Sequence, residues 1–152
     1  MIFYLGVQTS EIRSPRNWSK SMSRYLGIDY GTKRVGLALS DESRRFAMPY
    51  RVLEGREVVI KKEIERICKK ENVTHIVVGL PAGLAGQETQ MTRKAKMFAG
   101  SLKSLGLLVE LENEFFSSGE AKRGPTKKQK IDAAAAALIL QSYLERWKGV
   151  IK

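Results

Sequence analysis

The stretch "YLGIDYGTKRVGLALSD", residues 25–41, contains two apolar, β-rich runs joined by a short polar turn. Residues 24–29 and 34–40 are typical of strands, and Gly31 between them permits a tight turn. The first run ends on a carboxylate, Asp29, although aspartate disfavours a strand interior. Asp29 is therefore either a turn-forming residue or a charge held at the rim of a sheet for chemistry.

The pattern on either side of this stretch predicts one mixed α/β domain with five strands flanked by helices. Three further strands are expected at 46–53, 73–80 and 106–112, and helices at 57–71 and 87–104, after Ser118, and from near Lys127. Three strands joined by short turns imply an antiparallel start. The later alternation of strands and helices implies parallel neighbours in the remainder of the sheet.

The composition favours a soluble protein with a polyanionic partner. The 152 residues carry 27 basic and 16 acidic side chains, for a net charge of +11. No apolar run is long enough to cross a membrane, so no membrane partner is expected. The single cysteine, Cys68, excludes an internal disulfide framework and fits a reducing compartment, so we expect a cytoplasmic protein.

Residues 1–21 differ from the rest of the chain and lack the features of a secretory signal. We interpret them as an extension, disordered or loosely docked, that precedes a domain at 22–152. Met22 stands two residues before the first strand and is a candidate natural start of translation.

Carboxylates follow two of the predicted strands. Asp29 lies at the carboxyl end of the first strand, where open α/β sheets place their ligands. Glu112 and Glu114 come at or just after the end of the last strand, and residues two apart on a strand point the same way. These glutamates either face one site or belong to a solvated acidic loop.

Asp132 is expected in the second turn of the last helix, where helix capping does not explain it. It shares a stripe with apolar residues of that helix, and a charge on a core-facing stripe needs a partner. The alanine run 133–137 lets the helix lie close to the sheet, which brings Asp132 toward the strand ends. The alternative is an ion pair with Lys128, one turn back.

Converging carboxylates repel one another unless a cation lies among them. Oxygen ligands suit Mg²⁺ or Mn²⁺, and two such ions can assist displacement at a phosphodiester. The segment 122–130 contains no acidic residue. It contains five cations, Lys122, Arg123, Lys127, Lys128 and Lys130. Cations in the first turn of a helix oppose its dipole, so phosphate contact explains them better than helix stability does. The alternative is a solvated basic loop.

The blocks "LGIDYGTKRVGLALSD", "IVVGLPAGLAG", "FAGSLKS" and "KKQKIDAAAAALILQSYL" resemble the YqgF/RuvX family. Its members have a ribonuclease H-like fold and are related to RuvC-type Holliday junction resolvases. The family is regarded as nucleases, with proposed roles in trimming the precursor of small-subunit ribosomal RNA and in resolving branched DNA. The resemblance covers Met22 to about Leu144.

The resemblance implies that Asp29, Glu114 and Asp132 are catalytic and bind Mg²⁺ or Mn²⁺. Glu112, two residues before Glu114, is a substitute for it. It also implies that the turn after Asp29 lets Lys33 and Arg34 approach a phosphate. The family usually reads Asp-Glu-Arg-Leu-Thr where this chain reads "NEFFS", residues 113–117. The acid before Glu114 is therefore an amide here, and the arginine after it is a phenylalanine.

We therefore expect a metal-dependent nuclease that acts on nucleic acid, most simply in processing the small-subunit ribosomal RNA precursor. The alternatives are a Holliday junction resolvase or a non-catalytic nucleic-acid-binding relative, which the altered 113–115 segment would explain. A nucleotide-binding phosphotransferase is disfavoured because a fold of that kind needs two domains to enclose ATP. Both a monomer and a homodimer remain open, and a resolvase is expected to be a two-fold dimer.

Overall fold

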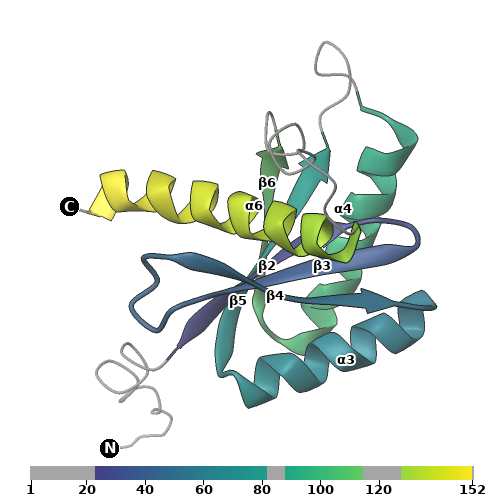
Figure 1. The fold of residues 1–152 in the computed structure, drawn as a ribbon, viewed down its shortest axis with the longest axis horizontal. Helices are drawn as coiled ribbons and strands as arrows, with labels where there is room; N and C mark the ends of the chain where they lie inside the picture. Colours follow the sequence, from purple (N-terminus) through teal and green to yellow (C-terminus); the bar gives the residue numbers. More distant parts are fainter. Residues whose placement is uncertain (1–22, 82–87, 115–127, 152) are drawn as a thin grey trace, which may run out of the picture.

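Five strands form one mixed sheet in the computed structural model, which describes residues 23–81, 88–114 and 128–151 (Figure 1). The strands are β2 (Arg24–Tyr30), β3 (Arg34–Ser40), β4 (Ala47–Glu54), β5 (Val73–Pro81) and β6 (Leu108–Glu114). Their order is β4-β3-β2-β5-β6, so β2 is central. β2, β3 and β4 are antiparallel neighbours, whereas β5 pairs parallel with β2 and with β6. The predicted antiparallel start and parallel remainder are confirmed.

Helices cover both faces of the sheet. α3 (Glu57–Lys70) and α4 (Gln90–Leu102) pack on one face, and α4 continues into the short 3₁₀ helix η2 (Lys103–Leu105). α6 (Lys128–Ile151) is the one helix of the described residues that crosses the opposite face (Figure 1). The core therefore has two parts, one on each side of the sheet. Among the described helices, none combines the length and apolar character needed to span a membrane.

Two element boundaries differ from the prediction in a way that affects the site. β6 extends to Glu114 because its parallel pairing with β5 continues to the Pro81–Glu114 position. α4 begins at Gln90, and the Thr89 hydroxyl accepts a hydrogen bond from the backbone N–H of Thr92 to cap it. The extension 1–21, the helix expected after Ser118 and the expected helix start at Lys127 lie outside the described residues.

Helix α6 lies so close to the sheet that its backbone contacts glycines of β2 and β3. A Cβ atom added at Gly27 would lie 2.7 Å from Leu140 Cβ and 2.9 Å from the Ala136 carbonyl oxygen. At Gly36 an added Cβ would lie 2.1 Å from the carbonyl oxygen of Asp132, well inside contact distance. The close approach predicted from the alanine run is thus confirmed, and the sheet contributes by omitting side chains at both contact points.

We predict that Gly36→Ala destabilises the protein, because the new methyl group cannot fit without moving α6. Overpacking of this kind costs about 1–3 kcal/mol or more in the free energy of unfolding, measurable by urea denaturation. Gly100→Ala is the matched control, since Gly100 lies in α4 with no atom within 4 Å of an added Cβ. The control should stabilise the protein by about 0.5–1 kcal/mol. Equal stability of the two variants would contradict the close packing of α6.

Candidate functional site

Asp29 lies near the carboxyl end of the central strand, on the face that α6 covers. It pairs with Gly36 of β3 and with Gly79 of β5. Paired residues share a face of a sheet, and Gly36 and Gly27 both contact α6. Asp29 is partly buried. Both of its cross-strand neighbours are glycines, and the backbone of α6 at Asp132 occupies the space over Gly36.

Asp132 reaches the same place from α6. Its backbone lies directly over Gly36, the residue that pairs with Asp29. Asp29 and Asp132 therefore occupy neighbouring positions on one face of the sheet, although 103 residues separate them in the sequence (132 minus 29). This juxtaposition is the arrangement expected for a shared carboxylate site.

Arg34 is the ion-pair partner of Asp132. Its Nε donates to Asp132 Oδ2 at 2.9 Å, and each side chain is 28% exposed. The partner considered from the sequence was Lys128, whose side chain lies outside the described part. Arg34 was expected at a phosphate, and in this structure its guanidinium instead faces a carboxylate of the candidate site. The carboxylate of Asp132 therefore binds a positive group, the Arg34 guanidinium, in the metal-free protein.

Glu112 is positioned differently from Asp29 and Asp132. Its side chain is 5% exposed, Ser142 Oγ donates to its Oε2 at 3.1 Å, and Arg146 Nη2 lies 2.8 Å from its Oε1. Ser142 follows Asp132 by ten residues, which is about 15 Å along a helix. Glu112 therefore ties β6 to the carboxyl-terminal half of α6, and both of its carboxylate oxygens are already engaged there.

Glu114 is the last residue of β6 and pairs with Pro81, two residues beyond the Gly79–Glu112 pair. This register places it at the carboxyl end of the sheet, and its side chain lies outside the described part. Among the side chains that are described, no three His, Cys, Asp or Glu groups gather at one point. The structure therefore places the backbone of Asp132 beside the strand position of Asp29, and it places Glu114 by register alone.

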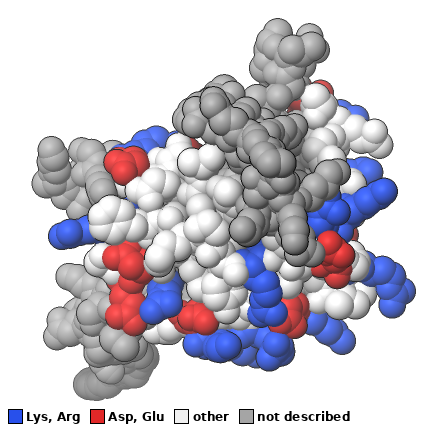
Figure 2. Space-filling model, viewed as in Figure 1, with Lys and Arg blue, Asp and Glu red and all other residues white. Residues whose placement is uncertain are grey.

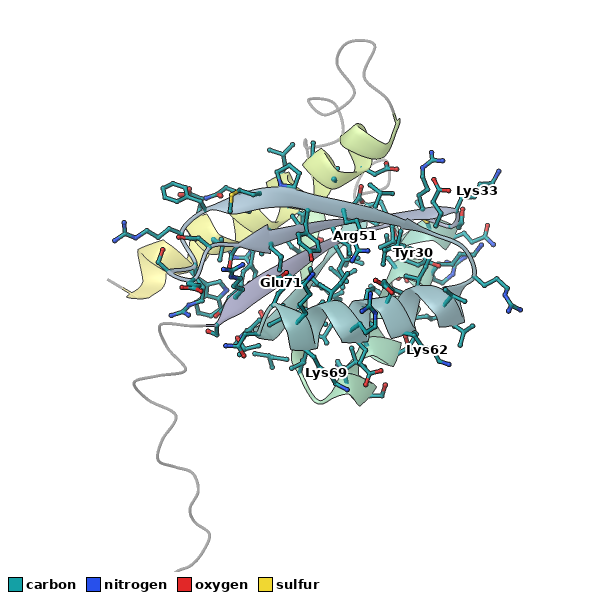
Figure 3. All side chains as sticks on the ribbon, turned by 60° about the horizontal axis from the view of Figure 1, so that its bottom comes forward. Tyr30, Lys33, Arg51, Lys62, Lys69 and Glu71 are labelled. Carbon is teal, nitrogen blue, oxygen red and sulfur yellow. The ribbon has the colours of Figure 1, made fainter. Side chains whose placement is uncertain are left out.

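The predicted phosphate-binding cations are described only in part. Lys33 lies exposed at the β2–β3 turn and extends away from the sheet (Figure 3). Gly31 permits this turn, because an added Cβ would lie 2.6 Å from the Arg34 carbonyl oxygen. Lys128 and Lys130 fall in the first turn of α6, with side chains outside the described part. Lys122, Arg123 and Lys127 lie outside the described residues.

Cys68 and His75 have packing roles. Cys68 is buried in α3, and burial raises the pKa of its thiol to about 12, so it is a poor nucleophile near neutral pH. His75 stacks on Tyr25, with ring centroids 4.2 Å apart and an interplanar angle of 13°. Burial lowers the pKa of His75, which favours the neutral ring. Both residues lie away from the Asp29–Asp132 pair.

The family profile of RuvX, described as Holliday junction resolvase, matches residues 23–146. The chain belongs to the RuvX family. A relative from Maridesulfovibrio salexigens is 40% identical over 134 residues, which are 81% of this chain and 98% of the relative. A relative from Chlorobaculum tepidum is 36% identical over 84% of this chain and 96% of its own length. Both relatives carry the name "Putative pre-16S rRNA nuclease".

The fold agrees with this family. The structure of T. thermophilus RuvC in complex with Holliday junction substrate superimposes with a TM-score of 0.55, covering 84% of this chain and 96% of the RuvC chain. The two sequences are 14% identical, so this likeness establishes the ribonuclease H-like fold alone. The predicted fold and family are confirmed.

Two features of the site were not predicted from the sequence. The first is that α6 contacts the sheet at Gly27 and Gly36. A glycine inside a strand often marks a close backbone approach, and this pattern could have indicated both contacts. The pairing of Arg34 with Asp132 spans 98 residues and depends on where α6 crosses the sheet. No local pattern in the sequence indicates it.

We predict that Glu112→Gln destabilises the protein and that Glu114→Gln does not. Glu112→Gln removes the charge that faces Arg146 and should lower the free energy of unfolding by roughly 1–2 kcal/mol. Glu114→Gln should leave the stability of the metal-free protein unchanged. Chemical denaturation in EDTA measures both. A larger loss from Glu114→Gln would identify Glu114 as the structural residue of the pair.

Proposed function

We propose that this RuvX protein is a metal-dependent nuclease that hydrolyses phosphodiester bonds in the precursor of small-subunit ribosomal RNA. The observation that carries the proposal is that the backbone of Asp132 lies over Gly36, the cross-strand partner of Asp29. Family membership supports the reaction class, and the names of the relatives support the RNA substrate. The cytoplasm is the compartment that suits such a substrate and a chain with one buried cysteine.

The residues at the site fit a divalent cation. Asp29 and Asp132 offer only oxygen, the donor that Mg²⁺ and Mn²⁺ prefer. The Arg34 guanidinium already stands beside Asp132 as a positive group. Asp29 and Asp132 would hold the ion, with Glu114 as the third ligand from the end of β6. When bound, Mg²⁺ or Mn²⁺ supplies an activated water and stabilises negative charge on the phosphate.

The remaining residues orient the substrate. The pair lies near the carboxyl rim of the parallel strands, where α/β sheets bind their ligands. Gly36 lets the backbone of α6 approach β3, and this holds Asp132 beside the strand position that pairs with Asp29. Lys33 extends from the turn next to Asp29, and the basic start of α6 approaches the same rim. These cations would bind phosphates on either side of the bond that is cleaved.

We predict that cleavage requires Mg²⁺ or Mn²⁺ and both aspartates. Three labelled substrates separate the candidate functions: a precursor ribosomal RNA fragment, a four-way DNA junction and plain duplex DNA. Asp29→Asn, Asp132→Asn and Glu114→Gln should each abolish cleavage of the RNA fragment and weaken Mn²⁺ binding, while binding of RNA in EDTA largely remains. Cleavage that persists in both aspartate variants would place the active site elsewhere.

The same assay distinguishes the alternatives. Preferential cleavage of the four-way junction would make the protein a resolvase. Binding of nucleic acid without cleavage under any metal condition would make it a non-catalytic relative, as the substituted 113–115 segment would explain.

We further predict that Arg34 competes with the metal ion for Asp132. Arg34→Gln should bind Mn²⁺ about tenfold more tightly, a difference of about 1.4 kcal/mol. It should also lower the melting temperature in EDTA, and saturating Mn²⁺ should close that gap to the wild type.

Arg24→Gln is the matched control, because Arg24 has a similarly exposed side chain and pairs with Glu42 and Glu71. It removes the same charge from the amino-terminal end of β2, so its effect on Mn²⁺ affinity should be below about twofold. Free Mn²⁺ measured by electron paramagnetic resonance gives the affinities without any cleavage. Unchanged or weaker Mn²⁺ binding by Arg34→Gln would show that Arg34 instead positions Asp132 for the ion.

A further inference from the structure

Helix α4 has a basic outward surface without acids. Residues 89–109 contain four cations, Arg93, Lys94, Lys96 and Lys103, and no Asp or Glu. The buried side chains of α4 face the sheet, and all four cations are exposed. In Figure 2, Lys and Arg gather on the side where α4 and the β2–β3 turn lie, and along the edge beside α3. The outward surface of α4 therefore carries only positive charge.

Most of this charge is not neutralised within the protein. Lys96 lies 3.6 Å from Glu88, whereas Arg93, Lys94 and Lys103 have no acidic partner among the described residues. Helix α3 differs, because Arg66 pairs with Glu63 and Lys69 pairs with Glu65. The positive charge of α3 is thus partly neutralised, and that of α4 remains available to a partner.

Gly100 lies exposed in the middle of this surface. Glycine is a poor residue for a helix interior, and packing does not require it here, since an added Cβ would have no neighbour within 4 Å. Lys96, Gly100 and Lys103 follow one stripe of the helix, at spacings of four and three residues. Met97, beside them, is 74% exposed. The exposed backbone of Gly100 therefore lies between cationic side chains. Glycine has no side chain to block the close approach of a ligand.

The first turns of α4 stand at the same rim as Asp29. Thr92 Oγ1 donates to the Pro81 carbonyl oxygen at 2.9 Å, which fixes the start of α4 to the carboxyl end of β5. Tyr30, the neighbour of Asp29, packs on Phe98 of α4 with ring centroids 4.7 Å apart. Asp29 faces α6 whereas α4 covers the other face of the sheet, so an RNA strand that leaves Asp29 reaches the outward surface of α4 by passing over this rim.

We propose that the outward surface of α4, formed by Arg93, Lys94, Lys96, Met97, Gly100 and Lys103, binds the phosphate backbone of single-stranded RNA that extends from the rim. This inference rests on the proposed function for its substrate class. Arg93, Lys94 and Lys103 contact phosphates, and Gly100 lets the RNA backbone approach the helix. The α4 surface thereby extends the binding site beyond the carboxylates, and it acts without a metal ion.

The test measures binding of a fluorescent single-stranded RNA of about 20 nucleotides to the full chain in EDTA, over a range of salt concentrations. The variant Arg93→Gln/Lys94→Gln/Lys103→Gln should flatten the slope of log affinity against log salt by about two units. The matched control Lys62→Gln/Lys69→Gln/Lys70→Gln removes the same charge from the exposed side of α3, from which Lys62 and Lys69 project (Figure 3). Its slope should stay close to that of the wild type. Equal losses in both variants would show a general charge effect and overturn the proposal.

Gly100→Gln supplies a second test that does not change charge. A side chain at this position has room in the free protein, so the melting temperature should not fall. RNA affinity should nevertheless drop about threefold or more, because the added side chain occupies the space that the RNA backbone needs. Unchanged affinity would remove Gly100 from the binding surface and contradict the proposal.

The outcome is separable from that of the proposed nuclease activity, since binding in EDTA requires neither metal nor cleavage. Wild-type protein that binds RNA through α4 but cleaves none would leave this inference standing and refute the nuclease. If the protein cleaves RNA but the α4 variant keeps the wild-type salt slope, the nuclease proposal stands and this inference is refuted.

Discussion

The direct contact of the α6 backbone with Gly27 and Gly36 is the constraint on which the candidate site depends. A side chain at either position would lift the helix away from β2 and β3. With glycine at both, α6 crosses the sheet at one position, and that position determines which of its residues meets Asp29. The carboxylate of Asp132 is useful only because its own carbonyl oxygen rests over Gly36. The opposite half of α6 is fixed by Glu112, through Ser142 and Arg146.

This constraint creates an electrostatic problem. Two partly buried carboxylates on neighbouring positions repel each other, and the repulsion is stronger than in water because the protein interior screens it less. Arg34 reduces the repulsion in the metal-free protein by donating to Asp132. The fold can therefore form before any ion binds. The consequence is that Arg34 competes with the metal ion for Asp132. A nuclease with this arrangement would hold its metal more weakly than the two carboxylates alone would allow, and it would have a guanidinium next to the phosphate when the ion enters.

Much of the fold was predictable from the sequence, because local patterns determine it. The alternation around Asp29, the apolar run 73–80 and the alanine-rich last helix each indicated their elements, and the turn lengths indicated the mixed sheet. The last two residues of β6 were missed, because pairing with β5 rather than local composition extends that strand to Glu114. The positions of Asp29 and Asp132 on two elements could be proposed from their places in the sequence. The partner of Asp132 and the separate role of Glu112 could not, since both depend on the crossing point of α6.

The central claim is that Asp29 and Asp132 share one divalent-metal site, and anomalous diffraction from crystals grown with Mn²⁺ tests it most directly. The account predicts one or two anomalous peaks within coordination distance of carboxylate oxygens of both aspartates, with the Arg34 guanidinium moved away from Asp132 Oδ2. Crystals in which Arg34 keeps its hydrogen bond to Asp132, and in which Mn²⁺ is absent or bound elsewhere, would contradict it.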